Sequence, residues 1–92
     1  MSAAIAQIPG TATVLLSGRE LAMLRAVQAG RATISHSQEP DLFIDGVSCG
    51  DQFTAHLLAH RGLIRPERPG SRGELRPAEL TPAGQIVLAD AG

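Results

Sequence analysis

The chain has 92 residues and a mass of 9.6 kDa, which is enough for one small domain and too short for two. Hydrophobic residues make up 43% and charged residues 18%, which fits a globular protein and excludes a highly charged disordered tail. The formal net charge of −1 excludes a surface that is basic all over, but it allows a local basic face.

Three features of the composition narrow the class further. All eight basic residues are Arg, which suits forked contacts with phosphate, although codon bias in a GC-rich genome gives the same composition. Only two aromatic residues are present, both Phe, which argues against stacking on single-stranded bases. A lone cysteine (Cys49), no signal-peptide pattern and no long apolar run predict a cytoplasmic protein with no membrane segment.

The N-terminal part predicts an arm followed by a helix. Residues 1–11 have no clear period and are expected to form a flexible arm, so that one folded domain spans residues 12–92. Thr11–Leu16 is β-branched and short, which favours an extended segment. Ser17-Gly18-Arg19-Glu20 matches a capping box, apolar residues follow at helical spacing, and Gly30 is a typical stop. A helix is therefore expected over residues 18–29.

Residues 31–47 allow two interpretations. Ala32-Thr33-Ile34 favours a short strand, and Asp45-Gly46 is a strong turn dipeptide. Between them, Leu42-Phe43-Ile44 is either a strand that pairs with residues 32–34 or one turn of helix. Propensity favours the strand, because Phe and Ile prefer a pleated surface.

A second helix is expected over residues 49–61. It begins at Ser48-Cys49-Gly50-Asp51, another Ser-x-x-acid start, and ends at Gly62. One face of its helical wheel contains Phe53, Thr54, Leu57 and Leu58 and is expected to pack inward. The opposite face contains Gln52, Ala55, His56, Ala59 and His60 and is expected to face solvent.

The C-terminal third predicts two strands around an exposed loop, then a helix. Leu63-Ile64 continues from Gly62 as a strand, and residues 65–77 are rich in Arg, Pro, Gly and Glu. Leu75 and Ala78–Leu80 could form the returning strand, in which Pro77 would need an edge or bulge position. Thr81-Pro82 supplies an N-cap and a first helical residue for the last helix, which Gly84 weakens.

Two motifs, in this order and spacing, resemble those of winged helix-turn-helix DNA-binding proteins, in particular small bacterial regulators of the MarR and PadR type. The matching residues are Leu57-Leu58-Ala59-His60-Arg61-Gly62-Leu63-Ile64 and Leu80-Thr81-Pro82-Ala83-Gly84. The resemblance implies an α+β winged-helix domain with about three helices and a small antiparallel sheet that forms the wing. The chain departs from the pattern where the family has a full helix before the recognition helix, because only Leu42–Gly46 is available there.

The resemblance also implies a binding surface for double-stranded DNA. The helix over residues 49–61 would lie in the major groove, and the loop over residues 65–76 would contact phosphates. Residues 61–76 have a net charge of +3, and the rest of the chain has −4, so that the charge is segregated. The expected DNA-binding residues are Gln52, Ala55, His56, His60, Arg61, Arg65, Arg68, Arg72 and Arg76.

No catalytic or metal site is expected, and no cofactor. His56 and His60 lie on one helix face, as zinc ligands often do, and Cys49 and His36 would have to complete the site. Two exposed histidines are the better interpretation. Cys49 lacks a well-placed base, and no Gly-rich phosphate loop follows a strand, so an enzyme is not expected.

The sequence therefore predicts a small transcriptional regulator that binds duplex DNA as a homodimer, because one helix and one wing bury little surface. The apolar segments Ile5–Ile8 and Ile86–Leu88 are the expected dimer interface. The alternative is a winged-helix module that binds a protein partner, or a second copy of itself, instead of DNA. The acidic remainder of the chain and the scarcity of Arg on the recognition face favour that alternative.

Overall fold

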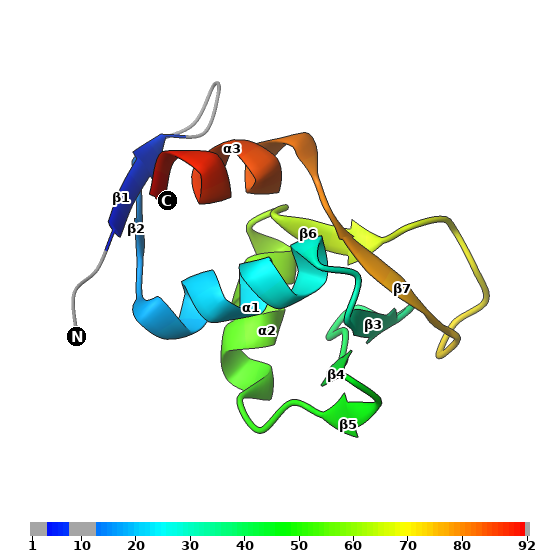
Figure 1. The fold of residues 1–92 in the computed structure, drawn as a ribbon. Coiled ribbons are helices and arrows are strands. Elements are labelled where there is room, and N and C mark those ends of the chain that lie inside the picture. Colours follow the sequence, from blue (N-terminus) through cyan, green and yellow to red (C-terminus); the bar gives the residue numbers. More distant parts are fainter. Residues whose placement is uncertain (1–3, 8–12, 92) are drawn as a thin grey trace.

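Groups of two or three strands alternate with single helices along the chain, as Figure 1 shows for a computed structural model that describes residues 4–7 and 13–91. In chain order they are β1 (Ala4–Gln7), β2 (Thr13–Leu16), α1 (Gly18–Gln28), β3 (Ala32–Ser35), β4 (Leu42–Ile44), β5 (Val47–Ser48), α2 (Gln52–His60), β6 (Ile64–Pro66), β7 (Leu75–Leu80) and α3 (Pro82–Ala91). The described residues thus form an α+β fold, as expected. None of the described helices is long and apolar enough to cross a membrane.

Helix α1 is the central element, and its predicted start and end are confirmed. The Ser17 hydroxyl accepts a hydrogen bond from the Glu20 amide at 3.2 Å, which satisfies a backbone donor at the helix start. Beyond its C-terminus, Gly30 has a φ of +79°, a conformation that favours glycine. Leu24 and Val27 are buried, and α1 packs against both other helices and the sheet (Figure 1).

The segment over residues 31–47 forms strands, which decides between the two interpretations of Leu42–Ile44. Strands β3 and β4 are antiparallel, with Ala32 opposite Ile44. Asp45 and Gly46 connect β4 to β5 with φ angles of +54° and +79°, the positive pair that a two-residue type I′ hairpin requires. Strands β4 and β5 therefore form a hairpin in this segment.

The two strands predicted around the loop over residues 65–77 are confirmed, but the sheet that they join is larger than the wing that was expected. Strands β6 and β7 are antiparallel, and β7 also pairs with β3, so that the five-stranded sheet has the order β5-β4-β3-β7-β6. Pro77 is not on an edge strand. Its carbonyl oxygen accepts a hydrogen bond from the Glu67 amide at 2.9 Å, just past the end of β6. In an antiparallel strand, the N–H and C=O groups of one residue point to the same neighbouring strand. The donor that Pro77 lacks would therefore point to the side of β6, which has already ended at Pro66, and not toward β3.

Helix α2 differs from the prediction in its start and in its orientation. Asp51, not Ser48, is the N-cap, because Ser48 belongs to β5. Ala55 is only 1% exposed and Leu58 is fully buried, whereas Phe53, expected in the core, is 73% exposed. The assignment of Ala55 to solvent and Phe53 to the core was therefore wrong. The inward face thus combines one small residue, Ala55, with one large one, Leu58, and α2 contacts α1 and β6.

The N-terminal segment is partly ordered into a hairpin. Strands β1 and β2 pair antiparallel, with Ala4 opposite Leu16, and β1 lies against α3 (Figure 1). Residues 4–7 of the expected flexible arm are therefore a strand, and the rest of that arm lies outside the described residues. Strand β1 and helix α3, which contain the described part of the expected dimer interface, lie beside each other within one chain. Val87 is fully buried and Ile86 is 36% exposed, so that interface stays a prediction.

The two sequence motifs meet in space at one backbone junction. The Leu63 carbonyl accepts a hydrogen bond from the Thr81 amide at 3.0 Å, and the Thr81 hydroxyl donates to the Gly62 carbonyl. The same hydroxyl accepts from the Gly84 amide at 3.0 Å, which confirms Thr81 as the N-cap of α3. A Cβ atom at Gly84 would lie 2.1 Å from the Leu63 oxygen. Gly84 is therefore required by the close approach of α3 to the end of α2.

Gly84→Ala is expected to destabilise the fold by on the order of 1–3 kcal/mol, because the added methyl group would push α3 away from the Leu63 carbonyl, just before β6. Gly50→Ala is the matched control, since a Cβ atom at Gly50 would meet nothing within 4 Å. Urea denaturation followed by circular dichroism measures both variants. Equal stability of the two variants would show that the junction is not tightly packed.

Candidate functional site

The arginines of the second half of the chain do not form a free cationic surface. Four of the five arginines over residues 61–76 are paired with carboxylates of the same chain. The pairs are Arg61–Glu20 at 3.4 Å, Arg65–Glu79 at 2.8 Å, Arg68–Glu67 at 3.4 Å and Arg76–Glu74 at 2.7 Å. For Arg72, no ion pair is found among the described residues. These surface pairs are weak, about 0–1 kcal/mol each, but they place a negative charge beside four of the five phosphate-binding candidates.

Two residues of α2 that the prediction placed against DNA, Gln52 and Ala55, make their contacts within the protein. The Gln52 amide donates to the Leu42 carbonyl at 2.9 Å, and its oxygen accepts from the Leu42 amide at 2.9 Å. Gln52 also donates to the Cys49 carbonyl at 2.8 Å, so this side chain ties α2 to β4. Ala55 is buried in the core. The prediction that Gln52 and Ala55 face DNA is therefore corrected, because the half-buried Gln52 amide is bonded to backbone groups of Leu42 and Cys49 and Ala55 is buried.

The two histidines of α2 face carboxylates instead of solvent alone. The loop between β3 and β4 places Glu39 Oε2 at 3.2 Å from His56 Nδ1 and at 3.3 Å from His60 Nε2. Asp41 Oδ1 lies 3.6 Å from His56 Nε2. Sequence reasoning missed both carboxylates, because nothing in the spacing links residues 39–41 to α2 until the hairpin folds. These carboxylates would repel a DNA backbone at this face.

The N-terminus of α2 is also negatively charged. Asp51 accepts hydrogen bonds from the Thr54 hydroxyl at 2.6 Å and the Thr54 amide at 3.0 Å. It also lies 2.8 Å from Arg19 Nη1. These contacts, with the Thr54 bonds first, lower the pKa of Asp51 from its ordinary value of 3.8 to about 2. A carboxylate of the chain thus already accepts hydrogen bonds at the start of α2, and its negative charge would repel a phosphate there.

Protonation of Asp51 is expected to contribute to acid unfolding. Because its pKa is lower in the folded chain, Asp51 stabilises the fold above pH 3.8, and this contribution is lost as the pH falls to about 2. Asp51→Asn keeps an N-cap acceptor and removes the titration, so its stability should fall less steeply over this range. Urea denaturation at several pH values measures the slope, with Asp90→Asn, an exposed carboxylate on α3, as the control. Identical slopes for all three chains would exclude the assigned role of Asp51.

The solvent-facing side of α2 contains an exposed apolar residue where the prediction placed none. Phe53 is 73% exposed in the first turn, and Leu57, one turn along, is partly exposed. Val47, on the strand before the helix, is 68% exposed. A phenylalanine at helical spacing predicts a core position from sequence, and no sequence signal distinguishes it from an exposed one. An exposed Phe on a small domain is more typical of a binding surface than of a solvated helix.

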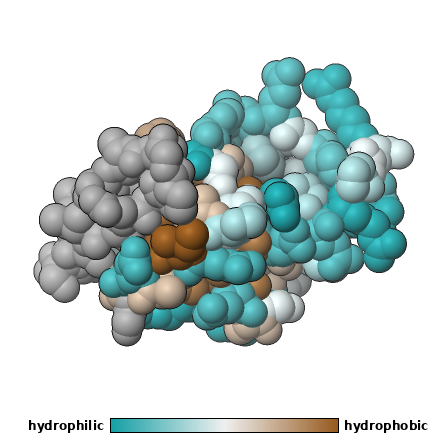
Figure 2. Space-filling model, turned by 90° about the horizontal axis from the view of Figure 1, so that it is seen from above, coloured by the Kyte–Doolittle hydropathy of each residue, from teal (hydrophilic) through white to brown (hydrophobic). Residues whose placement is uncertain are grey.

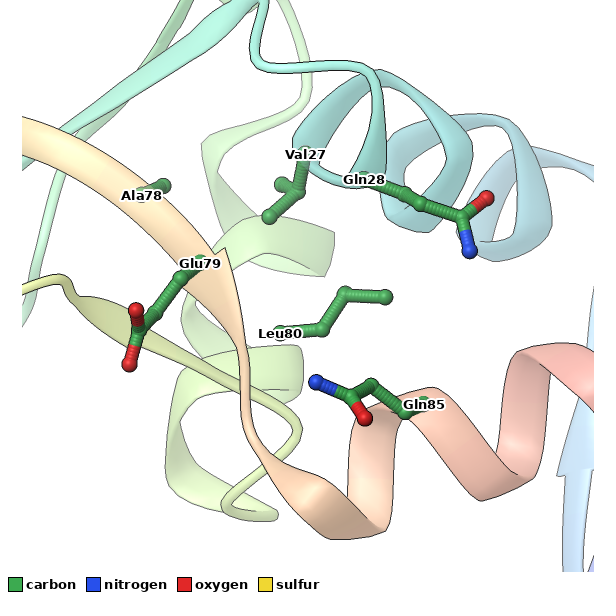
Figure 3. A pocket seen from close by; sticks show the side chains of 6 residues that line it. All are labelled: Val27, Gln28, Ala78, Glu79, Leu80 and Gln85. Atoms are coloured by element: carbon green, nitrogen blue, oxygen red, sulfur yellow. The ribbon is translucent and has the colours of Figure 1, made fainter.

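One hollow of the surface has a lining that is poor in chemically active groups. An open depression of about 370 Å³ lies between α1, β7 and the start of α3, lined by Val27, Gln28, Ala78, Glu79, Leu80 and Gln85 (Figure 3). Its one charged residue, Glu79, points away from Leu80 and Gln85 and is paired with Arg65. The other polar groups are two amides, which supply neither a nucleophile nor a general base.

Figure 2 shows a second view of the molecule, in which hydrophilic residues cover the half that bears the loop between β6 and β7.

Comparison of the chain with protein-family models, with curated proteins and with solved structures finds no match. The geometry of the described residues is therefore the basis for a functional proposal.

Proposed function

We propose that this protein is a winged-helix-type interaction module that forms a homodimer through the outward face of α2. The single observation on which the proposal depends is the 73% exposure of Phe53 on that face. Burial of a Phe side chain contributes about 1.5–3 kcal/mol, and two copies would bury two such side chains at one interface.

The order of the elements supports a winged-helix-type scaffold. Helix α2 runs directly into β6, and β6, β7 and β3 are neighbours in the sheet, with α3 following β7. The hairpin of β4 and β5 takes the place of the helix that usually precedes the recognition helix. The proposal is therefore that α2 keeps the position of a recognition helix but presents an apolar surface.

The direction of α2 is compatible with a second copy of the chain as the partner. Asp51 at the N-terminus of α2 is already paired with Arg19, and Arg61 at its C-terminus with Glu20, so the argument does not depend on free charge at the helix ends. An antiparallel pair of α2 helices, centred between Phe53 and Leu57, would bring the start of each helix to the end of the other. Such a pairing is self-complementary, as a two-fold interface must be, and it also opposes the two helix dipoles.

Phe53→Glu is expected to shift the protein from dimer to monomer. The charge would replace buried apolar surface and should weaken association by at least about tenfold, given the free energy of burying each ring. Sedimentation equilibrium measures the mass, which should be twice the 9.6 kDa chain mass for the wild type. Leu75→Glu is the control, because Leu75 is an apolar residue of β7 that is also half exposed. A monomeric wild type, or a dimer that persists in Phe53→Glu, would refute the proposal.

DNA binding is the second candidate, and the loop between β6 and β7 is the observation that favours it. Arg68 is 66% exposed, and Arg72 lies near it on this exposed loop. Because the ion pair of Arg68 with Glu67 is at the surface and weak, a phosphate could compete with the carboxylate.

Fluorescence anisotropy with a generic labelled duplex at low salt tests this candidate. Contact through the loop predicts binding that weakens as salt rises, and Arg68→Ala with Arg72→Ala should reduce both the affinity and the salt slope. Phe53→Glu is the comparison, since direct phosphate contact does not require Phe53. Absence of binding in the wild type, or the same affinity in the double variant, would exclude this loop as a DNA contact.

A further inference from the structure

The loop between β3 and β4 is fixed at its ends but not at its tip. The Ser35 amide donates to the Asp41 carbonyl at 3.0 Å, and the Asp41 amide donates to the Ser35 hydroxyl at 2.8 Å, so the two ends are joined. Residues 37–40 take part in none of the backbone hydrogen bonds found among the described residues, and Glu39 is exposed. The tip that carries Glu39 can therefore move while the ends of the loop stay in place.

Two histidines of α2 contact this tip through one carboxylate. Glu39 Oε2 lies 3.2 Å from His56 Nδ1 and 3.3 Å from His60 Nε2. The two histidines are four residues apart, so both rings project from the same side of the helix and reach the same carboxylate. These separations are short enough for ion pairs when the rings carry a positive charge. The attraction between the tip and α2 therefore depends on the protonation of the rings.

A second carboxylate faces the other nitrogen of His56. Asp41 Oδ1 lies 3.6 Å from His56 Nε2, which is buried and has no hydrogen-bond partner. A neutral imidazole donates from one nitrogen and has a lone pair on the other, so one of the two carboxylates would face that lone pair. A charged imidazolium has a proton on both nitrogens and can pair with Glu39 and Asp41 at once. The surroundings of His56 are therefore complementary to the charged ring.

The other charged side chains of the elements that pack on α2 have partners of their own. The pairs are Arg19–Asp51 and Arg61–Glu20, which join α1 to the two ends of α2, and Arg65–Glu79, which joins β6 to β7. Carboxylates and guanidinium groups ordinarily keep their charge between about pH 5 and 8, whereas imidazole does not. A change of pH in this range therefore acts on the contact between the loop and α2 through the histidines.

We propose that Glu39, His56 and His60 form a pH-sensitive clasp between the β3–β4 loop and α2, with Asp41 as a fixed second partner of His56. Toward about pH 5 the rings are charged and hold the Glu39 carboxylate, so the clasp is closed. Toward about pH 8 the rings are neutral, the charge-assisted contacts are lost, and the tip leaves α2 together with Glu39. The stability of the closed loop is thus present at acidic pH and is lost as the pH rises.

Nuclear Overhauser effects between the His56 ring and the Glu39 methylene groups measure the clasp, because these carbon-bound protons do not exchange with water. In the unmodified chain the effects should be strong at about pH 5.5 and lose most of their intensity by about pH 8, together with the titration of the two rings. Glu39→Gln keeps the length of an exposed side chain and removes its charge. Its effects should be weak already at the lower pH and should not change as the pH rises.

Asp45→Asn is the matched control, because Asp45 is an exposed carboxylate that pairs with Arg31 and not with a histidine. This variant loses the same charge as Glu39→Gln and should keep the pH dependence of the unmodified chain. The clasp lies within one chain and does not rest on the homodimer, so the result should be the same at low and high protein concentration. The proposal is overturned by equal intensities at both pH values, by an unaltered pH dependence in Glu39→Gln, by its loss in Asp45→Asn, or by a pH dependence found only at high concentration.

Discussion

The approach of α3 to the Leu63 carbonyl is the contact on which the rest of the structure depends. It joins the end of α2, the start of β6, the end of β7 and the start of α3 through the backbone of Gly62, Leu63 and Thr81. Only glycine at position 84 allows the helix to come this close. The junction fixes where α2 ends relative to β7 and α3.

This junction also gives a physical reason for the two motifs that resemble winged-helix proteins. Gly62-Leu63 and Thr81-Pro82-Ala83-Gly84 lie far apart in sequence but form one hydrogen-bonded unit. Their residue types are explained by a turn, a helix cap and a close backbone contact. The motifs therefore encode how a hairpin is attached between two helices. They contain no information about what the exposed surface binds, which the surface side chains decide.

Local chemistry made most of the fold predictable. The cap at Ser17, the stop at Gly30, the turn at Asp45-Gly46 and the cap at Thr81 are all short-range signals, and each one is confirmed. The orientation of α2 was not predictable, because apolar residues lie on both of its faces and the choice between them depends on packing against α1. The sheet was larger than expected because β4 and β5 extend it beyond the predicted wing.

The candidate site was harder to predict than the fold, since its key contacts join distant segments. Glu20 and Glu79 neutralise arginines that a charge count assigns to a basic loop, and Glu39 and Asp41 reach α2 from another element. A charge count along the sequence cannot include such pairs. The resulting surface around α2 has an exposed phenylalanine with acidic and histidine side chains nearby, which suits contact with protein better than contact with phosphate.

The most direct test of this account is isotope-filtered NMR on a mixture of ¹³C-labelled and unlabelled chains. An interface centred on α2 predicts nuclear Overhauser effects between the Phe53 ring of one chain and the Leu57 methyl groups of the other. Intermolecular effects found only at α3 or the sheet, or none at any residue, would contradict the assignment of the α2 face as the site of self-association.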